Sequence, residues 1–145
     1  MRRLRRRVTV TTSDDEGSVL LLTLGYALLT IAAILVCVDA TSLYLAQKRL
    51  DSLADAAALA GADGFALAVV DDEPVASLTG DAVRAQADAI VVAVGGGAVL
   101  LSAGTEDGVS ARVTVADTWR PPVLTIFVPD GVALQATATS RTALR

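Results

Sequence analysis

The chain has 145 residues, a formal net charge of -4, no histidine and a single cysteine. That length allows one domain of ordinary size rather than two. The lack of histidine removes most metal sites, acid–base triads and pH switches, and one cysteine cannot form an internal disulfide framework or a cysteine-cluster metal site. We therefore do not expect an enzyme, a cofactor, a bound metal ion or a small-molecule substrate.

The first segment, residues 1–17, is basic at its start, with five arginines between positions 2 and 7. An uncharged, strongly apolar run of 21 residues follows at 18–38, and in a helix it would span about 31 Å, close to the hydrocarbon core of a bilayer. This run predicts one transmembrane helix. Because positive flanks stay in the cytoplasm and residues 39–145 carry an acidic excess, we expect the N-terminus inside the cytoplasmic membrane and the rest outside.

Two alternatives concern the same region. The arginine run lacks the interleaved aromatic residues of a nucleic-acid-binding segment, so no nucleic-acid partner is expected. A cleaved secretory signal is the other alternative, because Val38-Asp39-Ala40 offers a cleavage pattern, although the apolar run exceeds the usual length of such signals.

The first helix is predicted to continue beyond the membrane over residues 39–62, because no proline or glycine interrupts the sequence until Gly61. Gly61 to Gly64 should end it. Apolar residues recur along this extension at spacings of three and four, the pattern of a helix packing along one line. We call these residues the packing seam: Leu43, Ala46, Leu50, Leu53, Ala57 and Ala60. The seam can rest on the chain's own domain, pack against other subunits, or do both.

Several motifs in positions 14–64 together resemble the N-terminal region of TadE/TadG-like proteins of tight-adherence (Flp-type) pilus assembly. They are Asp15-Glu16-Gly17-Ser18, the apolar run, Val38-Asp39-Ala40, Gln47-Lys48-Arg49-Leu50 and Ala54-Asp55-Ala56-Ala57-Ala58-Leu59-Ala60-Gly61. The resemblance implies a pilin-like minor subunit or assembly factor whose partners are the lipid bilayer and other pilin-like or pilus-assembly subunits.

The resemblance also raises a possible processing site between Gly17 and Ser18. Pilin-like precursors that are cut after a glycine carry a glutamate five residues further on, and this chain has Leu22 there. We therefore expect a permanent anchor rather than a cleaved one.

Residues 63–145 are predicted to form a small extracytoplasmic α+β domain. The sequence Asp71-Asp72-Glu73-Pro74 is typical of a solvated turn, and helical spacing from Thr79 ends at the glycine triplet 95–97. The period then changes to two, which predicts a hairpin around the loop 104–108 and a later strand over 132–139. Because this domain has few large side chains, we infer that the outer half of the long helix supplies its core.

The apolar run from Val123 to Val128, just after Trp119, is predicted to be a strand buried beneath the long helix. An exposed partner patch and a membrane-skimming loop are the alternatives. The expected fold class is thus α+β and membrane-anchored, with a long N-terminal helix packed on a small antiparallel sheet and a second helix, in a pilin-like arrangement.

Carboxylates are the remaining candidates for chemistry, namely Glu106, Asp107 and Asp117. None has a nucleophile or an orienting partner nearby in the sequence, so no catalytic role is assigned to them. The alternative to a pilus role is a membrane-anchored extracytoplasmic binding or sensor module of the cell envelope.

Overall fold

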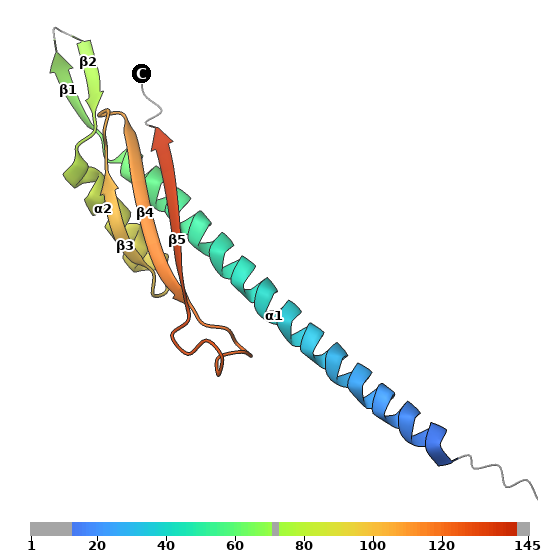
Figure 1. Ribbon diagram of the computed structural model, residues 1–145. Helices are drawn as coiled ribbons and strands as arrows, with labels where there is room; N and C mark the ends of the chain where they lie inside the picture. The colour runs from blue at the N-terminus through green and yellow to red at the C-terminus, as the bar shows by residue number, and fades with distance from the viewer. Residues whose placement is uncertain (1–12, 71–72, 142–145) are drawn as a thin grey trace, which may run out of the picture. The chain divides into compact units, whose positions relative to one another are not determined.

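The computed structural model describes residues 13–70 and 73–141, and the chain divides after Val38 into two compact units. The expected α+β class is confirmed, with a long apolar N-terminal helix and a three-stranded antiparallel sheet (Figure 1). The elements in chain order are α1 (Ser13–Asp63), β1 (Ala66–Val70), β2 (Glu73–Ser77), α2 (Gly80–Val94), β3 (Val99–Gly104), β4 (Ser110–Trp119) and β5 (Val132–Arg141).

Helix α1 is continuous over 51 residues and ends at Asp63, within the predicted stop at Gly61 to Gly64. Gly61 itself lies inside the helix at a point of close approach. A Cβ atom there would stand 3.0 Å from Cγ1 of Val83 and 3.4 Å from Cβ of Ala111. The missing side chain therefore lets both α2 and β4 approach the last turns of α1.

The core of the second unit lies between the two helices and one face of the three-stranded sheet. The alternation predicted for β4 is confirmed, because Ala111, Val113 and Val115 are completely buried. They form one cluster with residues of both helices, so α1 and α2 cover the same face (Figure 1). The helical members are Leu50, Leu53, Ala54, Ala57, Ala58 and Ala62 of α1 and Val83, Ala87 and Val91 of α2. The inference that α1 supplies core residues to this domain is confirmed.

The sheet has the strand order β3-β4-β5, and both pairs are antiparallel. Strand β4 pairs along its whole length with β5, from Ser110 opposite Arg141 to Trp119 opposite Val132. Between the strands, the hydroxyls of Thr114 and Thr137 are hydrogen-bonded at 3.0 Å. This bond satisfies Thr114, which is buried.

Helix α2 follows the predicted pattern closely. The Thr79 hydroxyl accepts a hydrogen bond from the Ala82 amide at 3.3 Å and caps the N-terminus. The helix ends at Val94, and Gly96 and Gly97 then take positive φ values of 64° and 132°, which favour glycine. The glycine triplet is therefore a helix stop, as predicted.

Two predictions about local structure are wrong. Glu73 and Pro74 belong to β2 of a separate two-stranded hairpin rather than to a turn, while Asp71 and Asp72 lie outside the described residues. A proline is tolerated there because a two-stranded ribbon leaves outward-facing N–H groups unpaired.

The second wrong prediction is the buried strand over 123–128. These residues form part of a loop between β4 and β5, and Ile126 and Phe127 are 89% and 79% exposed. Prolines at 121, 122 and 129 flank the run, and proline cannot donate to a strand ladder. Residues 124–128 close a turn of their own, with the Phe127 amide donating to the Leu124 carbonyl at 2.9 Å.

The tight packing of α1 is testable with two neighbouring alanines. Ala57 is 0% exposed, so Ala57→Leu should lower the free energy of unfolding by about 1–3 kcal/mol through overpacking. Ala56 is exposed, and Ala56→Leu should change it by less than about 0.5 kcal/mol. Urea unfolding of the full chain in detergent measures both values, and equal losses would contradict this account of the core.

Candidate functional site

The three carboxylates considered for chemistry do not form a site. Glu106 and Asp107 lie in the turn between β3 and β4, whereas Asp117 lies near the other end of β4. All three are exposed, and Glu106 makes a long ion pair with Arg112 at 3.9 Å. Among the residues that the structure describes, no three histidine, cysteine, aspartate or glutamate side chains gather in a group able to hold a metal ion.

Asp107 instead organises its own turn. Its Oδ1 accepts hydrogen bonds from the amides of Ser110 at 2.6 Å and Val109 at 2.9 Å, and its Oδ2 accepts one from the Ser110 hydroxyl at 2.8 Å. These donors, with the Ser110 amide foremost, hold the pKa of Asp107 well below its usual range. The carboxylate is therefore a structural acceptor that fixes the hairpin.

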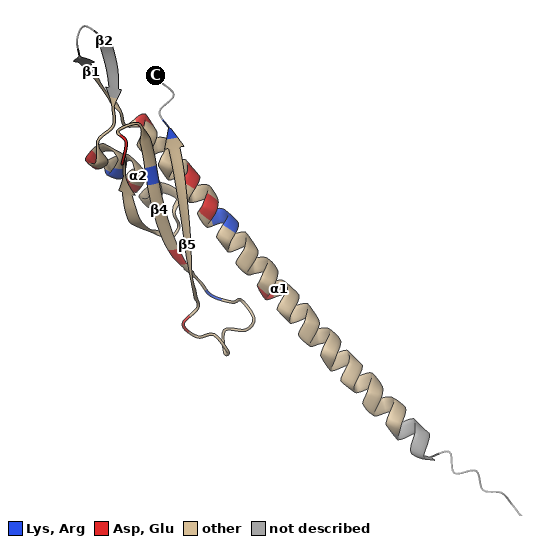
Figure 2. Ribbon diagram, turned by 45° about the horizontal axis from the view of Figure 1, so that its top comes forward, with Lys and Arg blue, Asp and Glu red and all other residues tan. Residues whose placement is uncertain are grey.

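An exposed apolar surface lies along the first part of α1. From Val19 to Val38 its large side chains are exposed except that of Leu35, which is half-buried, and Figure 2 shows no charged residue along this stretch. α1 is long and apolar enough to cross a membrane. Gly17 and Ser18, the possible processing site, fall within α1, and cleavage between them stays a prediction.

The packing seam lies mostly toward the interior of the second unit. Leu50, Leu53 and Ala57 are buried in its core, and the other members, Leu43, Ala46 and Ala60, are half-buried. These positions correspond to a helix resting on its own domain. Packing of the seam against other subunits stays a prediction.

Beside the seam, the second unit has an open groove of about 700 Å³ between α1 and the segment that joins α2 to β3. Leu45 and Val94 give it exposed apolar walls, and Arg49 adds a positive charge. We call this feature the groove, and its lining is Leu45, Ala46, Lys48, Arg49, Leu50, Ser52, Leu53, Ala56, Val94, Gly95, Gly96, Ala98 and Asp117.

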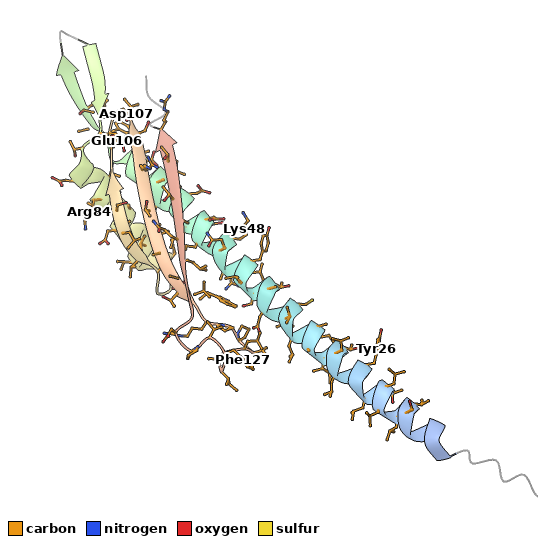
Figure 3. All side chains as sticks on the ribbon, in the orientation of Figure 1. Tyr26, Lys48, Arg84, Glu106, Asp107 and Phe127 are labelled. Atoms are coloured by element: carbon orange, nitrogen blue, oxygen red, sulfur yellow. The ribbon has the colours of Figure 1, made fainter. Side chains whose placement is uncertain are left out.

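One edge of the groove is fixed by polar contacts. Lys48 forms an ion pair with Asp51 at 3.3 Å (Lys48 is labelled in Figure 3). The side-chain amide of Gln47 donates a hydrogen bond to the Asp51 carboxylate at 2.9 Å and another to the backbone carbonyl of Gln135 in β5 at 3.2 Å. The pKa of Asp51 is lowered, first by the hydrogen bond from Gln47 and then by Lys48.

The loop of residues 120–131, which we call the apolar loop, is held to the start of the second unit by two side chains of α1. Oδ1 of Asp39 accepts a hydrogen bond from the Val123 amide at 3.2 Å. Just before the loop, Nε1 of Trp119 donates to the Ser42 hydroxyl at 3.1 Å. Asp39 is only 5% exposed, and its Oδ2 has no hydrogen-bond partner within the described part of the chain.

Sequence reasoning named Asp39 only within the Val38-Asp39-Ala40 motif and assigned no functional role to Ser42, Leu45 or Val94. A signal existed for Asp39, because it is the first charged residue after the uncharged run of 18–38. No comparable signal existed for Leu45 and Val94, because they belong to different helices and only the packing of α2 brings both into the groove.

The comparison with protein families gives one match. A family model described as "Putative Flp pilus-assembly TadE/G-like" matches residues 17–89, half of the chain. The matched region includes most of α1, the β1–β2 hairpin and the first part of α2. Neither the curated proteins nor the solved structures contain a match to this chain.

The contact between Asp39 and Val123 can be tested at the amide. Asp39→Ala should speed hydrogen exchange of the Val123 amide by about tenfold, because the amide loses an acceptor worth roughly 1.4 kcal/mol. Asp39→Asn keeps a carbonyl oxygen and is the matched control, with a much smaller change. Identical exchange rates in the two variants would show that the hydrogen bond does not hold the loop.

The turn at Asp107 should make stability depend on acid pH. Its pKa is lower in the folded chain than the ordinary value of 3.8, so the stabilisation is complete above that value and is lost as the pH falls toward the folded pKa. Asp107→Asn should therefore destabilise the chain fully at about pH 5 and to a smaller extent at about pH 2.5, where part of the stabilisation has been lost. Urea unfolding at both values measures this, with Glu106→Gln as a control that removes a neighbouring charge without touching Ser110. A pH-independent loss in Asp107→Asn would contradict the assignment.

Proposed function

The chain belongs to the TadE/G-like family of Flp pilus assembly, and from this premise we propose that it is a membrane-anchored, pilin-like minor subunit or assembly factor of such a pilus. It acts by helix packing and anchoring. The family is one of assembly and structure, and the candidate carboxylates support no reaction.

The continuity of α1 is the observation that carries this proposal. One helix holds both an apolar segment with exposed side chains and a segment whose residues form the core of a folded unit. A helix that is apolar all round is stable in lipid, where no polar face is required. The same helix can therefore contribute both a membrane anchor and part of a folded core.

The proposed organisation follows from charge and hydropathy along the sequence. Residues 1–17 are cytoplasmic, 18–38 cross the cytoplasmic membrane once, 39–62 extend the helix outside, and 63–145 complete the outer domain. The arginines between positions 2 and 7 support this orientation, because positively charged flanks remain in the cytoplasm. The basic end itself lies largely outside the described residues.

Contact with other pilus components is proposed for the groove and for the neighbouring half-buried seam residues. Leu50 and Leu53 are engaged in the core, so a partner helix would need the side chains beside them. Leu45 is 50% exposed and lines the groove. An amphipathic helix of another pilin-like subunit would suit this surface, because apolar and charged side chains line it together.

Deletion of the gene should abolish Flp piliation, and the wild-type chain should restore it. Leu45→Asp should fail to restore pili or to co-purify with pilus components, because it places a charge in the groove. Leu67→Asp is the matched control, since Leu67 is an exposed leucine of β1 away from the groove, and it should restore piliation fully. Electron microscopy and affinity purification give the two readouts.

The possible results separate the function from its proposed surface. Normal piliation in the deletion strain would overturn the pilus role and favour an envelope binding or sensor module. Loss of pili on deletion together with full activity of Leu45→Asp would leave the pilus role standing and overturn the groove as the contact surface.

A further inference from the structure

We propose that the apolar loop, residues 120–131, inserts its tip into the outer surface of the lipid bilayer beside the point where α1 leaves it. The inserted side chains are those of Ile126 and Phe127, the latter labelled in Figure 3. This inference rests on the membrane-anchoring part of the proposed function and adds a second contact of the same chain with lipid.

The direction of the loop follows from contacts between the sheet and α1. Near the start of β4, Ala111 lies close to Gly61, and toward its other end Trp119 bonds to Ser42. Between them, Gln135 of β5, which pairs with Ala116 of β4, accepts a hydrogen bond from Gln47. Within the second unit the sheet therefore follows α1 backward toward Asp39, the first residue of that unit, and the loop after Trp119 continues in that direction.

The loop contacts the first residue of the second unit. Its Val123 amide bonds to Asp39, which directly follows Val38 in the same helix. Ile126 and Phe127 come three and four residues after Val123 in a compact turn, so they lie closer to it than the roughly 14 Å that four extended residues would span. The interfacial layer on each side of the hydrocarbon core is roughly 5–7 Å thick, so the tip lies within reach of it.

The conformation of the loop presents apolar side chains outward instead of hiding them. The Phe127 and Val128 amides both donate to the Leu124 carbonyl, which makes a compact turn with Ile126 at its surface. The loop then closes at Gly131, where φ is +73° and a Cβ atom would stand 2.6 Å from the Trp119 carbonyl oxygen. A closed turn with two exposed large apolar residues at its tip has a fixed shape, so little ordering is required on insertion.

The chemistry of the loop suits a lipid surface. Isoleucine and phenylalanine gain free energy on leaving water for the boundary between headgroups and acyl chains. The charged residues, Arg120 and Asp130, occur only toward the ends of the loop, where they can stay among the headgroups. A tip of this kind needs no protein partner, which distinguishes lipid from the alternative of a protein patch.

The test uses the full chain in liposomes that contain no other protein. In a Cys37→Ser background, Phe127→Cys is labelled with an environment-sensitive NBD fluorophore, and quenching by nitroxide-labelled phospholipid is measured. Glu106→Cys, in the turn at the opposite end of β4, is the matched exposed control. We expect quenching at least about threefold greater at position 127 than at position 106, because only the former lies in the interface.

A third site, Tyr26→Cys within the apolar run, separates failure of this inference from failure of anchoring. Quenching at 26 and 127 but not at 106 supports the insertion. Quenching at 26 alone overturns the insertion and leaves the membrane anchor standing. Absence of quenching at all three positions overturns the anchor and the insertion together.

A second measurement without a fluorophore label tests whether the label itself causes the insertion. Trp119 is the only tryptophan of the chain and lies at the base of the loop, so brominated phospholipid should quench its emission. The double variant Ile126→Ser/Phe127→Ser should lose at least about half of that quenching, while Val99→Ser/Leu101→Ser, two exposed residues of β3, should retain it. Equal quenching in both double variants would overturn the proposal.

Discussion

The close packing of small residues in the last turns of α1 is the interaction on which the outer unit depends. Ala54, Ala57, Ala58 and Ala62 are buried, and Gly61 leaves room for Val83 and Ala111. Small side chains allow a helix to approach a sheet and a second helix at once, and the area they bury together replaces the large side chains that the sequence lacks. Without this half of α1, the sheet would lose one wall of its core.

Helix α1 contributes residues to both compact units. Because α1 continues without a break past Val38, the first residues of the outer unit belong to the helix that contains the apolar run. A partner that binds the groove therefore contacts a helix whose other half is suited to lipid. This arrangement agrees with the proposed role in pilus assembly through helix packing and anchoring.

Several polar side chains stabilise local structure in this molecule through hydrogen bonds to the backbone. Asp107 fixes a hairpin, Asp39 holds the apolar loop, and Gln47 joins α1 to β5. Each of these contacts uses a side chain to satisfy or position backbone amides and carbonyls where regular structure ends or where a helix meets a strand. The contacts of Gln47 and Asp39 join the sheet and the apolar loop to α1.

The sequence alone determined the long helix, the end of α2 at the glycine triplet and the alternation of Ala111, Val113 and Val115, because helix and strand periodicity and glycine stops are local signals. Sequence composition also predicted that the outer half of α1 completes the core. Only the tertiary structure decided that residues 123–128 are an exposed loop, that a hairpin includes Glu73 and Pro74, and that Leu45 and Val94 share a groove. An apolar run reads the same in a strand and in a loop, and residues far apart in sequence meet only once the helices and strands have packed.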